Sequence, residues 1–231
     1  MTTENHGSTL ARRSFVTRLT SAFGIFAAGA SAAQAQSVGG SSWQPSRHEQ
    51  DDWMDKLPGK HRFIFDTTTA AGFGGAILFA NNYFVANQNA YGLQNSDLAV
   101  IIVARHQSTA FAFNDTIWEK YGTAITAQVK LNDPKTQQAP KNNLYNASGY
   151  GAALENLGVT VDSLLKRGAH LAVCQVASRA LAGSIARAAG GNTDSVYNEL
   201  DANALSNSHM VPAGIVAVNR AQERGYSFVH A

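Results

Sequence analysis

An uninterrupted apolar run, Leu98–Val103, constrains the fold of this chain more than any other feature of the sequence. The run has the length of one strand, and it offers no polar position that could face water. Strands of this kind occur in parallel sheets that are covered by helices on both faces. The run therefore predicts an α/β architecture with a buried, parallel central strand.

Shorter apolar runs alternate with stretches that have helical character. They predict further strands at His61–Thr67, Leu171–Val173 and Tyr226–Val229. Helices are expected between and around these strands, with ends marked by capping residues and glycines: 50–57, 71–91 before Gly92, 114–122 with Asn114 as cap and Gly122 as stop, 160–166, 176–189 before Gly190, 193–205, and 212–225. Together they predict one domain with an open parallel sheet and helices on both faces.

The first 35 residues have the pattern of an export signal. Arg12 and Arg13 are followed by Phe15, as in a twin-arginine signal, and a mildly apolar run with two glycines comes next. Ala33-Gln34-Ala35 is a small-residue cleavage site. We therefore expect a periplasmic protein that is exported by the twin-arginine pathway and cleaved near Ala35.

The rest of the chain divides into three parts. Residues 36–60 are Ser/Gly-rich and then polar, which predicts a tether, and residues 61–231 form the α/β domain. Within that domain, residues 123–150 are polar and interrupted by prolines. A loop of this length in a compact domain is usually functional or disordered, so we expect a flap near the carboxyl edge of the sheet.

The charge balance argues against two classes of partner. Removing residues 1–35 takes away three of the 18 basic residues and one of the 16 acidic residues, which leaves fifteen of each. A neutral mature chain gives no indication of a nucleic-acid partner. Membrane association is expected only through the uncleaved signal.

Cys174 is the single cysteine of the chain, so the chain has no internal disulfide. It lies where an apolar strand ends and an Ala-rich helix begins. The N-terminus of a helix stabilises a thiolate, and α/β sheets bind ligands outside the carboxyl ends of their strands. Cys174 is therefore the first candidate for a reactive residue, and a small buried hydrophobe is the alternative interpretation.

Two other polar residues follow predicted strands. Asp66 closes the strand at 61–67, and His106 follows the strand at 97–105. Because carboxyl ends of parallel strands share one edge, Cys174, His106 and Asp66 could converge. His106 would then hold the thiolate or act as acid or base, and Asp66 would orient His106. The alternative is that His106 and Asp66 only bond backbone in local turns.

Resident cofactors and metals have little support in the sequence. Cys174, His106, His209 and His61 are possible metal ligands, but no paired spacing such as H-x-x-x-H or C-x-x-C accompanies them. The turn Gly72-x-Gly74-x-x-Ile77 lacks the third glycine of a dinucleotide site. We therefore expect no cofactor.

Four stretches of the chain resemble the DsrE/DsrF-like sulfur-relay family, and in particular its exported branch. They are Lys60–Asp66, Ser96–His106, Leu165–Cys174, and Val211–Val216 with Gln222–Tyr226. The resemblance implies a three-layer α/β sandwich, homo-oligomers, and a persulfide-carrying cysteine at the position of Cys174. The segment 123–150 is longer than in compact members, and relay proteins of the family work in the cytoplasm.

The residues and the resemblance lead to one preferred function and two alternatives. The preferred function is an exported sulfur-handling protein in which Cys174 carries a persulfide. Its partners would be a sulfur donor or acceptor protein, or a small sulfur compound. The first alternative is a non-catalytic oligomeric protein that binds a small ligand or a partner at the same edge, and the second is a metal or haem binder.

Overall fold

The computed structural model describes residues 44–231. The predicted twin-arginine signal, its cleavage site at Ala35 and the first part of the tether lie outside the described residues. Within residues 44–231, no helix combines the length and the hydropathy needed to cross a membrane.

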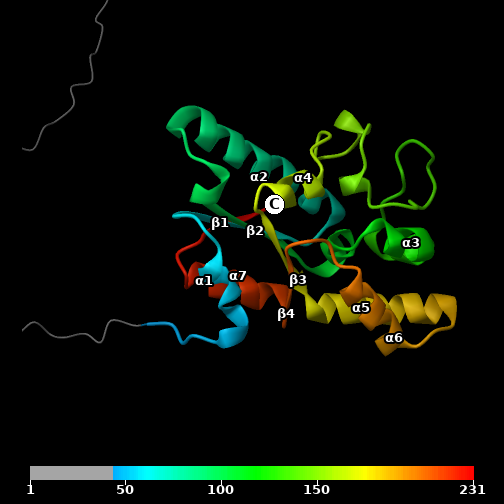
Figure 1. The fold of residues 1–231 in the computed structure, drawn as a ribbon. Helices are drawn as coiled ribbons and strands as arrows, with labels where there is room; N and C mark the ends of the chain where they lie inside the picture. Colours follow the sequence, from blue (N-terminus) through cyan, green and yellow to red (C-terminus); the bar gives the residue numbers. More distant parts are fainter. Residues whose placement is uncertain (1–43) are drawn as a thin grey trace, which may run out of the picture. The chain divides into compact units, whose positions relative to one another are not determined.

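The core of the domain is a parallel sheet of five strands in the order β4-β3-β2-β1-β5 (Figure 1). The strands are β1 (His61–Thr67), β2 (Leu98–Ala104), β3 (His170–Cys174), β4 (Ser208–Val211) and β5 (Ser227–His230). Strand β2 lies at the centre, and all of its residues are buried. The predicted α/β fold class and the buried parallel strand are thereby confirmed.

Helices cover both faces of the sheet. Within residues 44–231 the α-helices are α1 (Trp53–Lys56), α2 (Ala70–Tyr91), α3 (Asp115–Val129), α4 (Val161–Lys166), α5 (Gln175–Ala189), α6 (Thr193–Ala202) and α7 (Gly214–Gln222). The short 3₁₀ helices of the same part are η1 (Glu49–Asp51), η2 (Asn95–Asp97), η3 (His106–Ala112), η4 (Leu144–Asn146) and η5 (Gly151–Ala153). Alternate residues of β2 serve two cores. Val100 and Ile102 pack with residues of α2 to α6, while Ile101 and Val103 pack with α1 and α7.

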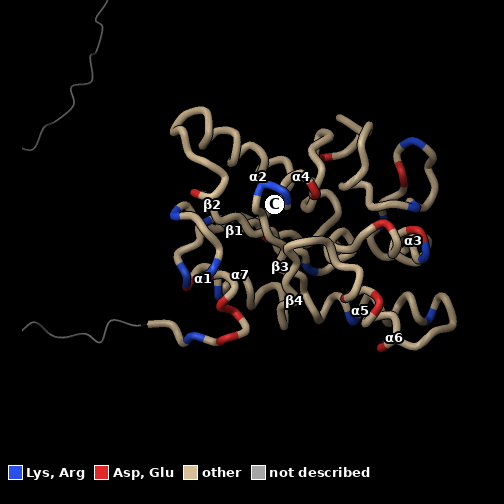
Figure 2. Tube along the Cα trace, viewed as in Figure 1, with Lys and Arg blue, Asp and Glu red and all other residues tan. Residues whose placement is uncertain are grey.

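Helix α1 is part of this packing, although its residues fall within the predicted tether. Met54 and Leu57 are buried against the sheet and α7. Arg224 donates to Asp55 at 2.9 Å, and the Tyr226 hydroxyl donates to the Met54 carbonyl at 2.8 Å. Figure 2 shows acidic and basic residues gathered around α1 and α7. The packed domain therefore begins before His61, because two apolar side chains in a polar stretch suffice to anchor α1.

Helix α3 differs from its predicted length. It does not stop at Gly122 but continues to Val129. A Cβ atom on Gly122 would overlap with the carbonyl oxygen of Pro140. The glycine thus permits a close approach between α3 and the following segment, and it does not end the helix.

The predicted flap at 123–150 is consequently wrong in its first part, which is helical. The remainder lies against the core and does not stand free. Leu144 and Tyr145 are fully buried. The Asn143 side chain donates to the carbonyl oxygens of Phe111 and Phe113 at 2.8 and 3.0 Å. This buried amide holds the segment against η3.

Strand β4 was not predicted from the sequence. It pairs with β3 at the edge of the sheet, with Cys174 opposite Val211. Only Val211 among its four residues is buried. An edge strand of this kind lacks the apolar run by which β2 was recognised. As a result, α6 ends at Ala202 and α7 begins only at Gly214.

Two histidines and a tryptophan stack beside the first residues of β3. His170 Nδ1 and His209 Nε2 are 2.9 Å apart. The ring of Trp53 in α1 stacks on His209 with centroids 3.8 Å apart and an interplanar angle of 8°. Burial lowers the pKa of His209 to about 4, with a smaller contribution from His170, and burial also lowers the pKa of His170.

This stack predicts a loss of stability in mild acid. The folded-state pKa of His209 lies below its unfolded value of about 6.5, so its contribution is complete above that pH and is lost as the pH falls toward 4. We expect the free energy of unfolding to be about 1–2 kcal/mol lower at pH 5 than at pH 7. Urea unfolding at both pH values measures it. His209→Gln should flatten the dependence, whereas His61→Gln, at an exposed position, should leave it unchanged; equal behaviour of the two variants would contradict the assignment.

Candidate functional site

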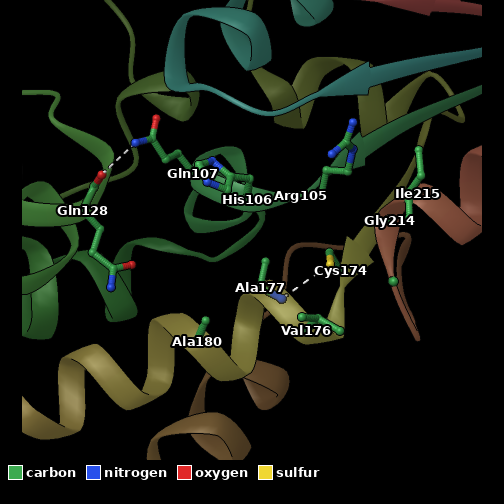
Figure 3. Close-up of a pocket in the computed structure, with 11 residues that line it drawn as sticks. Arg105, His106, Gln107, Gln128, Cys174, Val176, Ala177, Ala180, Gly214 and Ile215 are labelled. Carbon is green, nitrogen blue, oxygen red and sulfur yellow. Dashed lines mark hydrogen bonds between the residues drawn. The ribbon is translucent and has the colours of Figure 1, made fainter.

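A cavity lies beside the carboxyl ends of β2 and β3, where Cys174 and His106 are brought together. Its volume is about 540 Å³. Figure 3 shows the residues that line it. They come from the ends of β2 and β3 and from η3, α3, α5 and the start of α7: Arg105, His106, Gln107, Gln128, Cys174, Val176, Ala177, Ala180, Ala213, Gly214 and Ile215. A sheet edge at which parallel strands end is the usual place for a ligand in this fold class.

Cys174 is the N-cap residue of α5. Its backbone is extended, and its Sγ accepts a hydrogen bond from the backbone N–H of Ala177 at 3.4 Å. The residue is 6% exposed. The first N–H groups of a helix have no partner within the helix, and they favour negative charge. The sequence prediction that this cysteine lies at a strand-to-helix junction is confirmed, and its sulfur faces the first turn of the helix.

His106 borders the same cavity from η3. Its backbone is left-handed, with φ of 57°. Its Nδ1 lies 3.3 Å from the carbonyl oxygen of Thr68. A carbonyl oxygen accepts, so Nδ1 carries the hydrogen in this contact, and the neutral ring then presents Nε2 as an acceptor. Cys174 and His106 thus share one cavity, with no direct hydrogen bond between them in the described part of the chain.

Asp66 has a different partner from the one expected. Its carboxylate receives two hydrogen bonds from Arg105, Nε to Oδ1 and Nη2 to Oδ2, both at 2.7 Å. His230 Nδ1 in β5 lies 3.1 Å from the same carboxylate. The Asp66 side chain is 3% exposed. Asp66 therefore holds Arg105 and His230, and it does not orient His106.

Arg105 also lies at the end of β2, and the sequence assigned it no role in the site. Hydrogen bonding to Asp66 raises its pKa, and the negative charges of Asp66 and of a Cys174 thiolate act in the same direction. The stem of Arg105 packs against α7, where a Cβ on Gly214 would come within 2.7 Å of the Arg105 Cβ. Figure 3 shows the guanidinium directed away from Cys174. Arg105 is thus a fixed positive charge in the cavity wall. Arg105 directly precedes His106. A histidine is the more common partner of a reactive thiol, so the sequence pointed to His106 and not to Arg105.

The remaining walls of the cavity are mostly apolar. Val176 and Ile215, at the starts of α5 and α7, are 63% and 58% exposed. These two exposed apolar side chains flank the opening of the cavity. Gln107 donates through Nε2 to the backbone carbonyl of Gln128 at 3.2 Å and closes the far end. These residues carried no signal in the sequence, because small and apolar side chains do not indicate a site by themselves.

The four possible metal ligands do not form one site. Cys174 and His106 border the cavity, whereas His209 stacks with Trp53 and His170, the first residue of β3. His61 is the first residue of β1. Among residues 44–231, no three His, Cys, Asp or Glu side chains are grouped as metal ligands. His61 begins β1 and so lies at the other end of the sheet from Cys174, while the ring of His209 is taken up by its stacking with Trp53.

The comparisons with known proteins give little further information. No protein-family model matches the chain, and no curated protein matches it. One solved structure that matches is that of MTH1491, a protein of unknown function from Methanobacterium thermoautotrophicum. The sequence identity is 13%, the match covers 74% of this chain and 100% of that chain, and the TM-score is 0.36.

Proposed function

We propose that the protein is an exported sulfur carrier of the DsrE/DsrF-like type, in which Cys174 accepts sulfane sulfur as a persulfide. The observation that carries the proposal is the position of the Cys174 sulfur, which caps α5 and borders a cavity of about 540 Å³. A cysteine in an electropositive environment with access to a ligand is the kind that reacts. The sequence resemblance supports the same residue.

The transfer needs no oxidant or reductant. The Cys174 thiolate attacks the outer sulfur of a persulfide donor, R–S–S⁻, and a new S–S bond forms. The S–S bond of the donor breaks, and R–S⁻ leaves with the electron pair. The product is the Cys174 persulfide anion, so the total charge is unchanged. Passing the sulfur on to an acceptor thiolate repeats the step in reverse.

The surroundings of Cys174 favour the anionic forms in this step. The Ala177 N–H donates to the sulfur, and the first turn of α5 contributes its partial positive charge. Arg105 also borders the cavity, but its guanidinium is paired with Asp66 and directed away from Cys174 (Figure 3), so its charge acts on the sulfur only weakly. His106 borders the same cavity, and its Nε2 would take the proton of the Cys174 thiol when the thiolate forms. The site therefore uses a thiol and a helix terminus, and no cofactor takes part in this scheme.

The reaction would take place in the periplasm, after export by the twin-arginine pathway. The partner would be a donor or acceptor protein or a small sulfur compound, and the family resemblance also favours a homo-oligomer. The exposed apolar side chains of Val176 and Ile215 are consistent with a surface that a substrate or a second protein covers.

Treatment of the purified protein with sodium polysulfide tests the proposal. We expect intact-mass analysis to show the addition of sulfur to the wild-type protein, and none to Cys174→Ser, with reversal by dithiothreitol. Iodoacetamide should alkylate Cys174 in the folded state. Ser195→Ala, at an exposed position of α6, is the control and should still accept sulfur. A folded wild-type protein that neither takes up sulfur nor reacts with iodoacetamide would refute the carrier function.

The same experiment separates the second candidate, a non-catalytic binding protein. The mainly apolar cavity favours it, since small-molecule sites are concave and apolar with few polar groups. In that case Cys174 stays unreactive in the folded protein, and Cys174→Ser folds with little loss of stability, because a serine hydroxyl would also cap α5.

A further inference from the structure

The cavity beside Cys174 is far larger than the sulfur that the proposed transfer would move. Its volume of about 540 Å³ lies within the range of about 300–1,000 Å³ that is typical of small-molecule sites. A single water occupies only about 30 Å³ of the liquid. The site therefore has room for the molecule that delivers the sulfur.

The shape of the cavity follows helix α5. Ala177 and Ala180 point from this helix toward His106 and Gln107 (Figure 3). At about 1.5 Å per residue, Ala180 lies about 9 Å farther along the helix axis than Cys174. Small side chains one turn apart leave a path along the helix, which begins at the Cys174 sulfur and ends near Gln128.

The chemistry of this path is apolar, with polar groups near its two ends. Val176, Ala177 and Ala180 line its length. Arg105 lies at the Cys174 end, and its Nε and Nη2 are already engaged by Asp66. A small, multiply charged sulfur anion would lose hydration to these methyl groups, because an unpaired charge is costly to desolvate. An apolar chain would gain free energy by burial there.

We infer that the donor is a low-molecular-weight organic persulfide whose apolar chain lies along α5 over Ala177 and Ala180. This inference rests on the proposed carrier function. The outer sulfur of the donor meets the Cys174 sulfur, and its inner sulfur leaves as the thiolate of the apolar chain. The amides of Gln107 and Gln128 meet the far end of that chain.

Ala180→Leu tests the inference, because leucine would fill the far half of the path and keep a good helix former. The matched control is Ala188→Leu, an exposed position of the same helix outside the cavity. For each protein, the rate of Cys174 persulfidation is measured with hexyl persulfide, released in situ from a caged precursor, and with sodium polysulfide. Each buried methylene accounts for about a fourfold change in affinity, so Ala180→Leu should slow the hexyl reaction about tenfold. The polysulfide rate should change less than about twofold, and Ala188→Leu should change neither rate.

The outcomes separate the inference from the proposed function. If neither donor modifies Cys174 of the wild-type protein, the carrier function fails, and the inference falls with it. If both donors modify Cys174 but Ala180→Leu slows both equally, or slows neither, the carrier function stands and the organic donor is refuted.

Discussion

Asp66→Asn is expected to lower the free energy of unfolding by about 2–3 kcal/mol, because it removes the charge from an ion pair whose carboxylate is buried. The Asp66 carboxylate accepts two hydrogen bonds of 2.7 Å from Arg105 and lies 3.1 Å from His230 Nδ1. Its side chain is 3% exposed, so water cannot replace these partners. The substitution leaves the Arg105 guanidinium without a counter-charge, and this is the costly part. Urea unfolding at pH 7 measures the loss.

Two further variants identify the cause of this loss. Asp194→Asn removes a carboxylate from an exposed pair with Arg179, and we expect a change of less than about 1 kcal/mol. Asp66→Asn combined with Arg105→Met removes both charges, so most of the stability should return. If Asp66→Asn were as mild as Asp194→Asn, the buried pair would not be the anchor of Arg105.

Much of the fold follows from local patterns in the sequence. The apolar run at Leu98–Val103 marks β2 because a central strand has no face on water. Asn114 and Thr160 cap their helices through side-chain oxygens, as predicted. Gly92 and Gly190 adopt the left-handed conformation that ends a helix. Each of these signals acts within a few residues, so a sequence shows it directly.

The features that the sequence did not predict depend on tertiary context. Strand β4 contains Ser208 and His209, and its place in the sheet is set by pairing with β3. A short helix was expected at 50–57, but its packing onto the domain was not, because α1 is anchored by Met54 and by the distant Arg224, which donates to Asp55. A polar stretch with a few apolar residues has the pattern of a tether when the residues it packs against lie far away in the sequence.

The candidate site shows the same division. Cys174 and His106 share a cavity because β3 and β2 are neighbouring parallel strands that end at one edge. The partner of Asp66 could not be predicted, because polar side chains also follow the ends of β2 and β3. The sequence does not show which of these side chains lies beside Asp66. Arg105 takes this place because a guanidinium presents two parallel donors to a carboxylate, which a single imidazole nitrogen does not.

A glycine such as Gly122 can be needed either to end a helix or to permit a close contact. A glycine after an amphipathic stretch is typical of a helix end. Here the helix continues to Val129, and the missing side chain lets the carbonyl oxygen of Pro140 lie against α3. The sequence alone does not distinguish a glycine needed for its backbone angles from one needed for its small size.

This distinction leads to a prediction with the opposite sign from helix propensity. Gly122→Ala should raise helix propensity by about 1 kcal/mol. The new methyl group would overlap with the backbone of Pro140, and overpacking of this kind costs about 1–3 kcal/mol or more. We expect a net destabilisation of about 1–2 kcal/mol and faster proteolysis of the segment 134–143, because that segment must move away from α3. Urea unfolding and limited proteolysis measure the two effects.

Gly183→Ala is the matched control, since Gly183 also lies within a helix. There the nearest atom to a new Cβ is Arg187 Nη1 at 3.5 Å, which is an ordinary contact with the end of a flexible side chain. This variant should gain about 0.5–1 kcal/mol from helix propensity, and its proteolysis should match that of the wild-type protein. If Gly122→Ala were stabilised like Gly183→Ala, the contact between Pro140 and α3 would be absent in solution, and residues 130–150 would behave as part of the flap that the sequence predicted at 123–150.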